Sequence, residues 1–172
     1  LSMLDLVEDA SEIEEVIELA KELEKAGINI INTGIGWHEA RVPTIVTSVP
    51  RAAFADITGR VKKELSIPVV ASNRINMPDV AEDIIASGKA DMVSMARPFL
   101  ADSEWVNKAA EGRADEINTC IACNQACLDH TFQMKRASCL VNPRAGHETK
   151  LLYTPVVKAK KVAVVGAGPS GL

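Results

Sequence analysis

The feature that most constrains the fold is an alternation of apolar and amphipathic segments over the first hundred residues. Apolar residues recur at helical spacing between Ile13 and Ala26, and Ser11 with Glu14 predicts a capped start for this helix. Continuous apolar strands separated by helices predict an α/β fold whose parallel sheet is buried on both faces. The expected strands are residues 2–7, 28–31, 68–72 and 91–96, and the other expected helices are 51–65, 78–87 and a short one from Pro98.

Polar residues directly after the strands favour one architecture. Four strands fit half of a (β/α)8 barrel or part of a doubly wound sheet, and only the barrel gathers active groups after every strand. Arg74 and Arg97 follow the last two of these strands. Either arginine alone fits a surface position, but cations near backbone N–H groups at helix starts bind phosphate. Their joint placement therefore predicts a phosphate site in the C-terminal half of a barrel.

A second polar group follows the strand expected at 28–31. His38 lies between Trp37 and Glu39, and Arg41 is close by. These residue types suit the orientation or protonation of a substrate, although a single histidine is as often structural or simply solvated. Arg41 fits either a contact to a substrate anion or a surface partner of Glu39.

Four cysteines fall within twenty residues. Cys120, Cys123, Cys127 and Cys139 have the spacing C-x2-C-x3-C-x11-C. Such clustering is typical of a metal site in a reducing compartment. Zinc usually takes two separated pairs of cysteines, whereas three close thiols and one distant thiol favour a [4Fe–4S] cluster. Four unrelated buried thiols are the remaining alternative.

A glycine-rich motif follows an apolar segment near the end of the chain. Residues 161–165 are expected to form a strand, and Gly166, Gly168 and Gly171 then have the spacing G-x-G-x-x-G. This is the dinucleotide-binding fingerprint, in which the second glycine lets the backbone approach a pyrophosphate. A simple glycine-rich turn is the alternative. The extended residues 148–160 mark a domain boundary.

Composition excludes several classes of function. Nineteen basic and 23 acidic residues give a net charge of −4, and two Trp, one Tyr and three Phe are too few for base-stacking platforms. We therefore expect no nucleic-acid partner, and no protein partner is evident. No apolar run is long enough to span a membrane, and no secretory signal is visible, so a cytoplasmic protein is expected. Both ends fall within expected elements, which predicts an interior piece of a longer protein that is inactive alone.

Six motifs occur in an order that resembles the NADH:flavin oxidoreductase (old yellow enzyme-like) family, in particular its [4Fe–4S]-containing 2,4-dienoyl-CoA reductases. The motifs are NTGIGWHEAR at 32–41, NRIN at 73–76, MVSMARPF at 92–99, CIACNQAC at 120–127, SCLVNP at 138–143 and VVGAGPSG at 164–171. The resemblance implies an enzyme that reduces 2,4-dienoyl-CoA thioesters in fatty acid β-oxidation. It implies a relay from NADPH through FAD, a [4Fe–4S] cluster and FMN to the substrate.

The resemblance also implies roles for particular residues. The four cysteines would hold the cluster, Arg74 would contact FMN, and Ala96 and Arg97 would bind the FMN phosphate. The acyl-CoA would be bound by His38, Glu39, Ala40 and Arg41, with His38 beside the catalytic acid. The FAD site would begin with Gly166, Gly168 and Gly171. The implied divisions are an FMN-binding half barrel at 1–114, an iron–sulfur segment at 115–147, a linker at 148–160 and the start of an FAD/NAD(P)-binding domain at 161–172.

Three alternatives remain open. A related enzyme of the enoate reductase or amine dehydrogenase type would have the same relay and another substrate. A zinc-binding structural module would explain the cysteines but neither the strand-end arginines nor the glycine motif. An electron-transfer subunit would bind the cluster without FMN.

Overall fold

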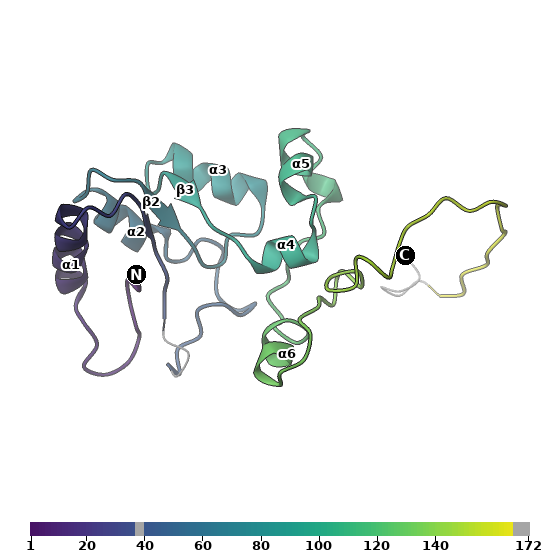
Figure 1. Ribbon diagram of the computed structural model, residues 1–172, viewed down its shortest axis with the longest axis horizontal. Helices are drawn as coiled ribbons and strands as arrows, with labels where there is room; N and C mark the ends of the chain where they lie inside the picture. The colour runs from purple at the N-terminus through teal and green to yellow at the C-terminus, as the bar shows by residue number, and fades with distance from the viewer. Residues whose placement is uncertain (37–39, 167–172) are drawn as a thin grey trace.

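The computed structural model describes residues 1–36 and 40–166, and its elements follow the predicted alternation (Figure 1). The sheet contains β1 (Ile31–Asn32), β2 (Val69–Ala71) and β3 (Met92–Val93). Between the strands lie α2 (Ala55–Lys62) and α3 (Pro78–Ala86), and α1 (Ile13–Lys25) precedes them. After β3 come α4 (Arg97–Ala101), α5 (Trp105–Ala110), the 3-10 helix η1 (Ala114–Glu116) and α6 (Leu128–Phe132).

The sheet is parallel and has the order β1-β2-β3. Ile31 pairs with Val69, and Val70 pairs with Met92. A parallel bridge between Ser2 and Gly34 extends the sheet beyond β1. The strand expected over residues 2–7 is thus reduced to this bridge. The chain turns away because Leu6 adopts a left-handed backbone conformation, with φ at 60°.

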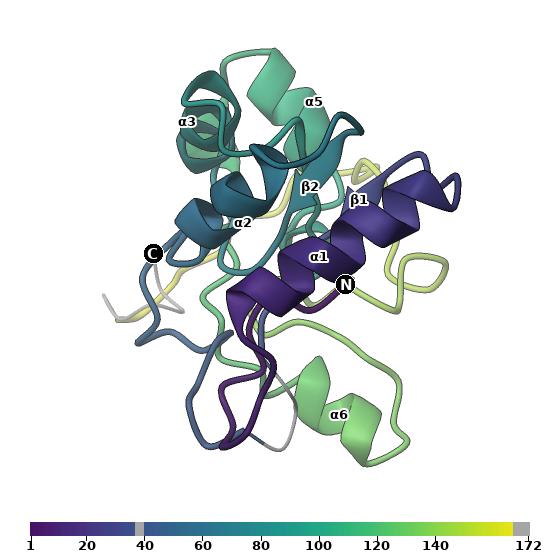
Figure 2. The same ribbon diagram turned by 90° about the vertical axis from the view of Figure 1, so that its left-hand side faces the viewer.

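Helices cover one face of the sheet (Figure 2). One apolar core joins α1 and α2 to β1 through Val16, Ala20, Ile31 and Val61. A second core lies over β2 and β3 and includes Ala71, Ile84 and Trp105. Both cores are built from the apolar stripes of amphipathic helices, as the sequence predicts.

The opposite face of the sheet is only partly covered by the described residues, so the expected burial on both faces holds for β2 but not for its two neighbours. Asn32, Val70 and Met92 lie side by side in the register, and Val70 at the centre is buried at 6% exposed. Asn32 is exposed, and Met92 is 51% exposed. Apolar strand residues predict burial, but the helices of the described residues lie on one side of the sheet.

The N-terminus of α1 differs from the prediction by one residue. Glu12, not Ser11, is the N-cap, and its backbone N–H donates to the Glu15 carboxylate at 3.0 Å. Glu15 thereby satisfies a backbone donor that the helix leaves without a partner.

The C-terminal part of the chain leaves the α/β body. Residues 151–166 run outward as an exposed extended segment (Figure 1). The strand expected at 161–165 is not formed, and Val162 and Val165 are 79% and 99% exposed. A parallel strand requires a neighbouring strand for its hydrogen bonds, and none of the described segments lies beside it. Within the described part of the chain, no helix has the length and apolarity needed to cross a membrane.

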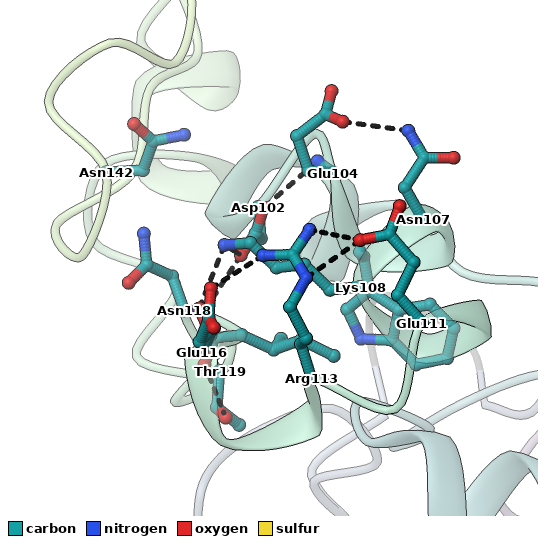
Figure 3. Close-up of polar contacts among 12 residues, drawn as sticks. Asp102, Glu104, Asn107, Lys108, Glu111, Arg113, Glu116, Asn118, Thr119 and Asn142 are labelled. Atoms are coloured by element: carbon teal, nitrogen blue, oxygen red, sulfur yellow. Dashed lines mark hydrogen bonds and ion pairs between the residues drawn. The ribbon is translucent and has the colours of Figure 1, made fainter.

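Asp102 ties α4, α5 and the segment after η1 together (Figure 3). Its carboxylate accepts hydrogen bonds from Lys108 Nζ at 2.7 Å and from the backbone N–H groups of Asn118 and Glu104 at 3.0 Å each. Burial raises the pKa of a carboxyl group, but these hydrogen bonds outweigh burial and lower the pKa of Asp102 below its ordinary 3.8. Because Asn118 lies two residues before Cys120, this network anchors the start of the cysteine segment.

Asp102→Asn is expected to lower the free energy of unfolding by about 2 kcal/mol at pH 7, because the pair with Lys108 loses its charge. Urea unfolding of the wild type and the variant measures this difference. The matched control is Asp115→Asn, which changes an exposed carboxylate on η1.

The difference between wild type and Asp102→Asn is also expected to depend on pH. The lowered pKa means that the carboxylate stabilises the folded state fully above 3.8 and loses this contribution as the pH falls through the folded-state pKa. A difference in stability that stays constant from pH 7 to pH 2 would contradict this assignment.

Candidate functional site

A hollow lies at the carboxyl ends of the three strands. Its walls come from β1, the turn after β2, the segment from β3 into α4, and Cys120, and it has a volume of about 360 Å³. Parallel pairing brings these ends together, with the Thr33 N–H donating to the Val70 carbonyl and the Ser94 N–H to the Ala71 carbonyl. Ser94 Oγ also donates to Asn32 Oδ1 at 3.0 Å across the mouth of the hollow. We call this the anion hollow, for the reason that follows.

The turn after β2 directs Arg74 toward the hollow. Asn73 and Arg74 both adopt left-handed conformations, with φ at 68° and 57°, a cost of roughly 1–3 kcal/mol per residue. Side-chain and backbone contacts hold this turn. Asn73 Nδ2 donates to the Ile35 carbonyl at 3.2 Å, and Arg74 Nε donates to the Val49 carbonyl at 2.8 Å.

Arg97 enters the same hollow from the start of α4. Its guanidinium donates through Nη1 to the Ile45 carbonyl at 2.9 Å and to Asn124 Oδ1. Ile45 belongs to the long loop before α2, so both arginines fasten this loop to the strand ends.

The charge in the hollow has one sign. Burial lowers the pKa of Arg74, Cys120 opposes this effect, and the positive charges of Arg97 and Arg51 lower the pKa further. Arg74 nevertheless stays charged at neutral pH. No carboxylate is among the described residues that line the hollow. Two half-buried guanidinium groups without a carboxylate partner among residues 1–36 and 40–166 favour a bound anion, and arginine suits phosphate in particular.

A second hollow lies directly beside the first and contains all four cysteines. This space is small, about 20 Å³, and it is lined by Cys120, Cys123, Cys127 and Cys139 together with Ala122, Ala126, Leu140 and other residues. We call it the cysteine hollow. Arg97 and Cys120 line both hollows.

The backbone around the cysteines is tightly wound. Ala122 and Asn124, on either side of Cys123, have left-handed conformations with φ at 55° and 62°. Gly146 packs against the chain just before Cys139, and a side chain at this position would meet the Ala137 carbonyl at 2.5 Å. These close approaches bring Cys139 to the same hollow as the other three cysteines, although Cys127, its nearest neighbour in sequence among them, lies twelve residues earlier.

The thiols have a chemistry suited to metal binding. Burial raises the pKa of the Cys139 thiol, and the nearby Cys120 and Cys127 raise it further. Hydrogen bonds from the backbone N–H groups of Val141 and Asn142 lower this pKa, but they do not outweigh burial. The free thiol is thus neutral at pH 7, and binding of a metal must displace its proton. Among residues 1–36 and 40–166, no three His, Cys, Asp or Glu side chains converge closely enough to hold a single ion.

Of the other residues that the sequence predicts in a binding site, Ala96 lies in the anion hollow and the rest lie outside both hollows or outside the described residues. Ala96 is exposed and lines the anion hollow. Ala40 is half-buried and Arg41 is exposed, and neither lines the two hollows. Gly166 lies in the exposed C-terminal segment with φ at 123°. His38, Glu39, Gly168 and Gly171 lie outside the described residues.

Sequence reasoning missed two buried asparagines between the hollows. Asn76 is 4% exposed and its Nδ2 donates to the Cys120 carbonyl at 2.8 Å, while Asn124 accepts from Arg97. Both stand inside motifs that the sequence singled out. Nothing in their spacing indicates which partner each amide finds, because those partners lie 44 and 27 residues away.

Comparison with known proteins assigns the family. A model described as the NADH:flavin oxidoreductase / NADH oxidase family matches residues 1–116. A metal reductase of Desulforamulus reducens is 51% identical over 150 residues, which cover 87% of this chain and 22% of that protein. An NADH oxidase of Thermoanaerobacter brockii is 39% identical over 174 residues, which cover 98% of this chain and 26% of that protein.

The structural comparison agrees. The structure of a 2-naphthoyl-CoA reductase with 2-naphthoyl-CoA matches with a TM-score of 0.95 and 39% identity, over 99% of this chain and 26% of that one. The chain belongs to the NADH:flavin oxidoreductase / NADH oxidase family. This confirms the expected family and the parallel α/β fold of its flavin oxidoreductases. The chain spans about a quarter of the length of these relatives.

Arg74→Met is expected to weaken the binding of FMN by about tenfold to a hundredfold, since one charge-assisted contact to phosphate contributes roughly 1.5–3 kcal/mol. Fluorescence titration of flavin-free protein with FMN measures the change. Arg51→Met is the control, because Arg51 is exposed and lies outside the hollow. Equal losses in the two variants would show that net charge alone, not the hollow, governs binding.

Proposed function

We propose that this chain belongs to a flavin and iron–sulfur oxidoreductase that uses NADPH to reduce a conjugated acyl-CoA thioester, with 2,4-dienoyl-CoA as the proposed substrate. The observation that carries the proposal is the pair of Arg74 and Arg97 in a hollow whose described lining contains no carboxylate, next to a hollow with four thiols. A zinc module alone would have no use for the first hollow.

The anion hollow is suited to FMN. Arg74 and Arg97 would bind its phosphate, with Ala96 offering backbone at the same wall. Asn73, Ser72 and Ser94 add polar groups at the strand ends. A phosphate held by two arginines would also relieve the mutual repulsion that lowers the pKa of Arg74.

The cysteine hollow is suited to a [4Fe–4S] cluster. Cys120, Cys123, Cys127 and Cys139 would be its ligands, and small apolar neighbours would keep water away. Bound flavin supplies hydride transfer, and a bound cluster supplies one-electron transfer. The residues shared by both hollows, Arg97 and Cys120, would keep the two groups adjacent.

The proposed division of the chain follows from these two sites. Residues 1–114 would form the second half of an FMN-binding barrel, residues 115–147 the cluster segment and residues 148–160 a linker. Residues 161–172 would begin an FAD-binding domain with Gly166, Gly168 and Gly171. The uncovered sheet face at Asn32 and Met92 would then be the barrel interior, covered by other parts of a longer protein.

The substrate proposal depends on residues 38–41. His38 would orient or protonate the thioester, and Glu39, Ala40 and Arg41 would line the acyl-CoA site. Support comes from the similar structure that holds 2-naphthoyl-CoA, since that ligand is also a conjugated acyl-CoA thioester. It makes an aromatic acyl-CoA the second candidate substrate.

An anaerobic absorption spectrum of the full-length protein, with iron and acid-labile sulfide assays, tests the cofactors. We expect flavin bands over a broad shoulder near ~400 nm, and about four iron and four sulfide per chain. A colourless protein that contains one zinc would overturn the relay. NADPH oxidation with 2,4-dienoyl-CoA and with 2-naphthoyl-CoA then identifies the substrate, and no turnover of either thioester would overturn the substrate proposal.

Cys123→Ser is expected to lose iron and to lose NADPH-dependent reduction of the substrate, because one ligand is missing. Reduction driven by dithionite, with FMN in excess, should persist because Cys123 does not line the anion hollow. Gln125→Ala, an exposed change in the same loop, should keep both activities. Full NADPH-dependent activity in iron-free Cys123→Ser would contradict the role of the cysteines.

A further inference from the structure

The wall between the two hollows is held by two asparagine side chains. Asn124 lies within the cysteine loop, is 9% exposed, and accepts a hydrogen bond from Arg97. Asn76 lies after β2 and donates from Nδ2 to the Cys120 carbonyl at 2.8 Å. Asn76 thus joins the lining of the anion hollow to the cysteine loop at Cys120, and Asn124 joins the cysteine loop to Arg97. We call Asn76 and Asn124 the asparagine clasp.

Of the two asparagines, Asn76 is anchored directly to the apolar core. Asn76 is fixed by its position before α3, and its carbonyl accepts from the Trp105 indole at 3.3 Å in the core. The cysteine loop, by contrast, has two residues in left-handed conformations, Ala122 and Asn124. Thr47 Oγ1 donates to the Ile121 carbonyl at 2.6 Å, which adds a link to the long loop that Arg97 also holds.

The side-chain oxygen of Asn76 indicates that this wall can accept a hydrogen bond from a bound molecule. Asn76 Oδ1 is buried and has no hydrogen-bond partner among the described residues, although Asn76 lines the anion hollow. An acceptor left without a donor costs roughly 1–3 kcal/mol. A donor on a molecule bound in the hollow would remove this cost.

We propose that the asparagine clasp couples the two sites, so that a filled cysteine hollow raises the affinity of the anion hollow for FMN. This inference rests on the proposed function. When metal ligation orders the cysteine loop, Asn124 holds Arg97 in place for the phosphate. Without ligation the loop loses order, and FMN binding must then order both Arg97 and Asn124. Because coupling is reciprocal, bound FMN also favours retention of the iron.

The residue type at position 124 fits this role. The asparagine oxygen accepts from Arg97 without neutralising its charge, so the guanidinium stays available to an anion. An aspartate of the same shape would pair with Arg97 and repel phosphate. Asn124 is therefore a positioning residue that acts through Arg97 and does not itself line the anion hollow.

The test measures the affinity of the full-length protein for FMN with and without iron. Flavin-free wild type should bind FMN about tenfold more weakly after the iron is removed by chelation under reducing conditions. Asn124→Ala with iron should bind FMN about tenfold more weakly than wild type, and removal of its iron should cause little further loss. Such non-additivity is the signature of coupled sites. Asn124→Asp should bind more weakly than Asn124→Ala.

The control is Asn142→Ala in the same segment. Asn142 Nδ2 donates to the Leu100 carbonyl at 2.9 Å, so the variant removes one contact between this segment and α4 and leaves the contact between Asn124 and Arg97 in place. We expect FMN affinity within about twofold of wild type. Equal weakening in Asn142→Ala and Asn124→Ala, or an unchanged affinity of iron-free wild type, would overturn the coupling alone. Wild type that binds no FMN would overturn the proposed function and the coupling with it.

Discussion

The parallel pairing of β2 with β1 and β3 is the constraint on which the rest of the structure depends. It places three strand ends at one edge, so that Ser94, Asn32 and the turn at Arg74 meet although they are far apart in the chain. The helices on the other side stabilise this pairing, because they bury Ile31, Ala71 and their neighbours in the two apolar cores. A short sheet of this kind needs no long strands, only a correct register and a covered face.

The second constraint is electrostatic. Two guanidinium groups share a hollow without a carboxylate, and each is held by carbonyls of the loop before α2. Backbone carbonyls orient an arginine but do not neutralise it, so the charge stays available for an anion. The same loop contacts Ile121 beside Cys120, and the cysteine hollow thereby becomes a neighbour of the anion hollow.

Local patterns in the sequence predicted the helices well and the sheet less well. The helix expected at 13–26 is observed at Ile13–Lys25. Its apolar stripe determines which face is buried, and Gly27 determines where the helix ends. The predicted N-cap was wrong by one residue, because Glu12 and Glu15 have the same three-residue spacing as Ser11 and Glu14 and form the capping box instead. The strands at 2–7 and 161–165 were wrong, because apolarity indicates a strand but does not supply the partner strand it needs.

The sequence by itself determined the α/β alternation, the family, and the residue types at the site: arginines after two strands and four clustered cysteines. These follow from local spacing and composition, which a chain carries in any conformation. Only the tertiary structure decided that Arg74 and Arg97 share one hollow, that Asn124 holds Arg97, and that Asn32 and Met92 stay exposed beside the buried Val70. The physical reason is that these contacts join residues far apart in the chain, whose distance is set by sheet register and loop packing.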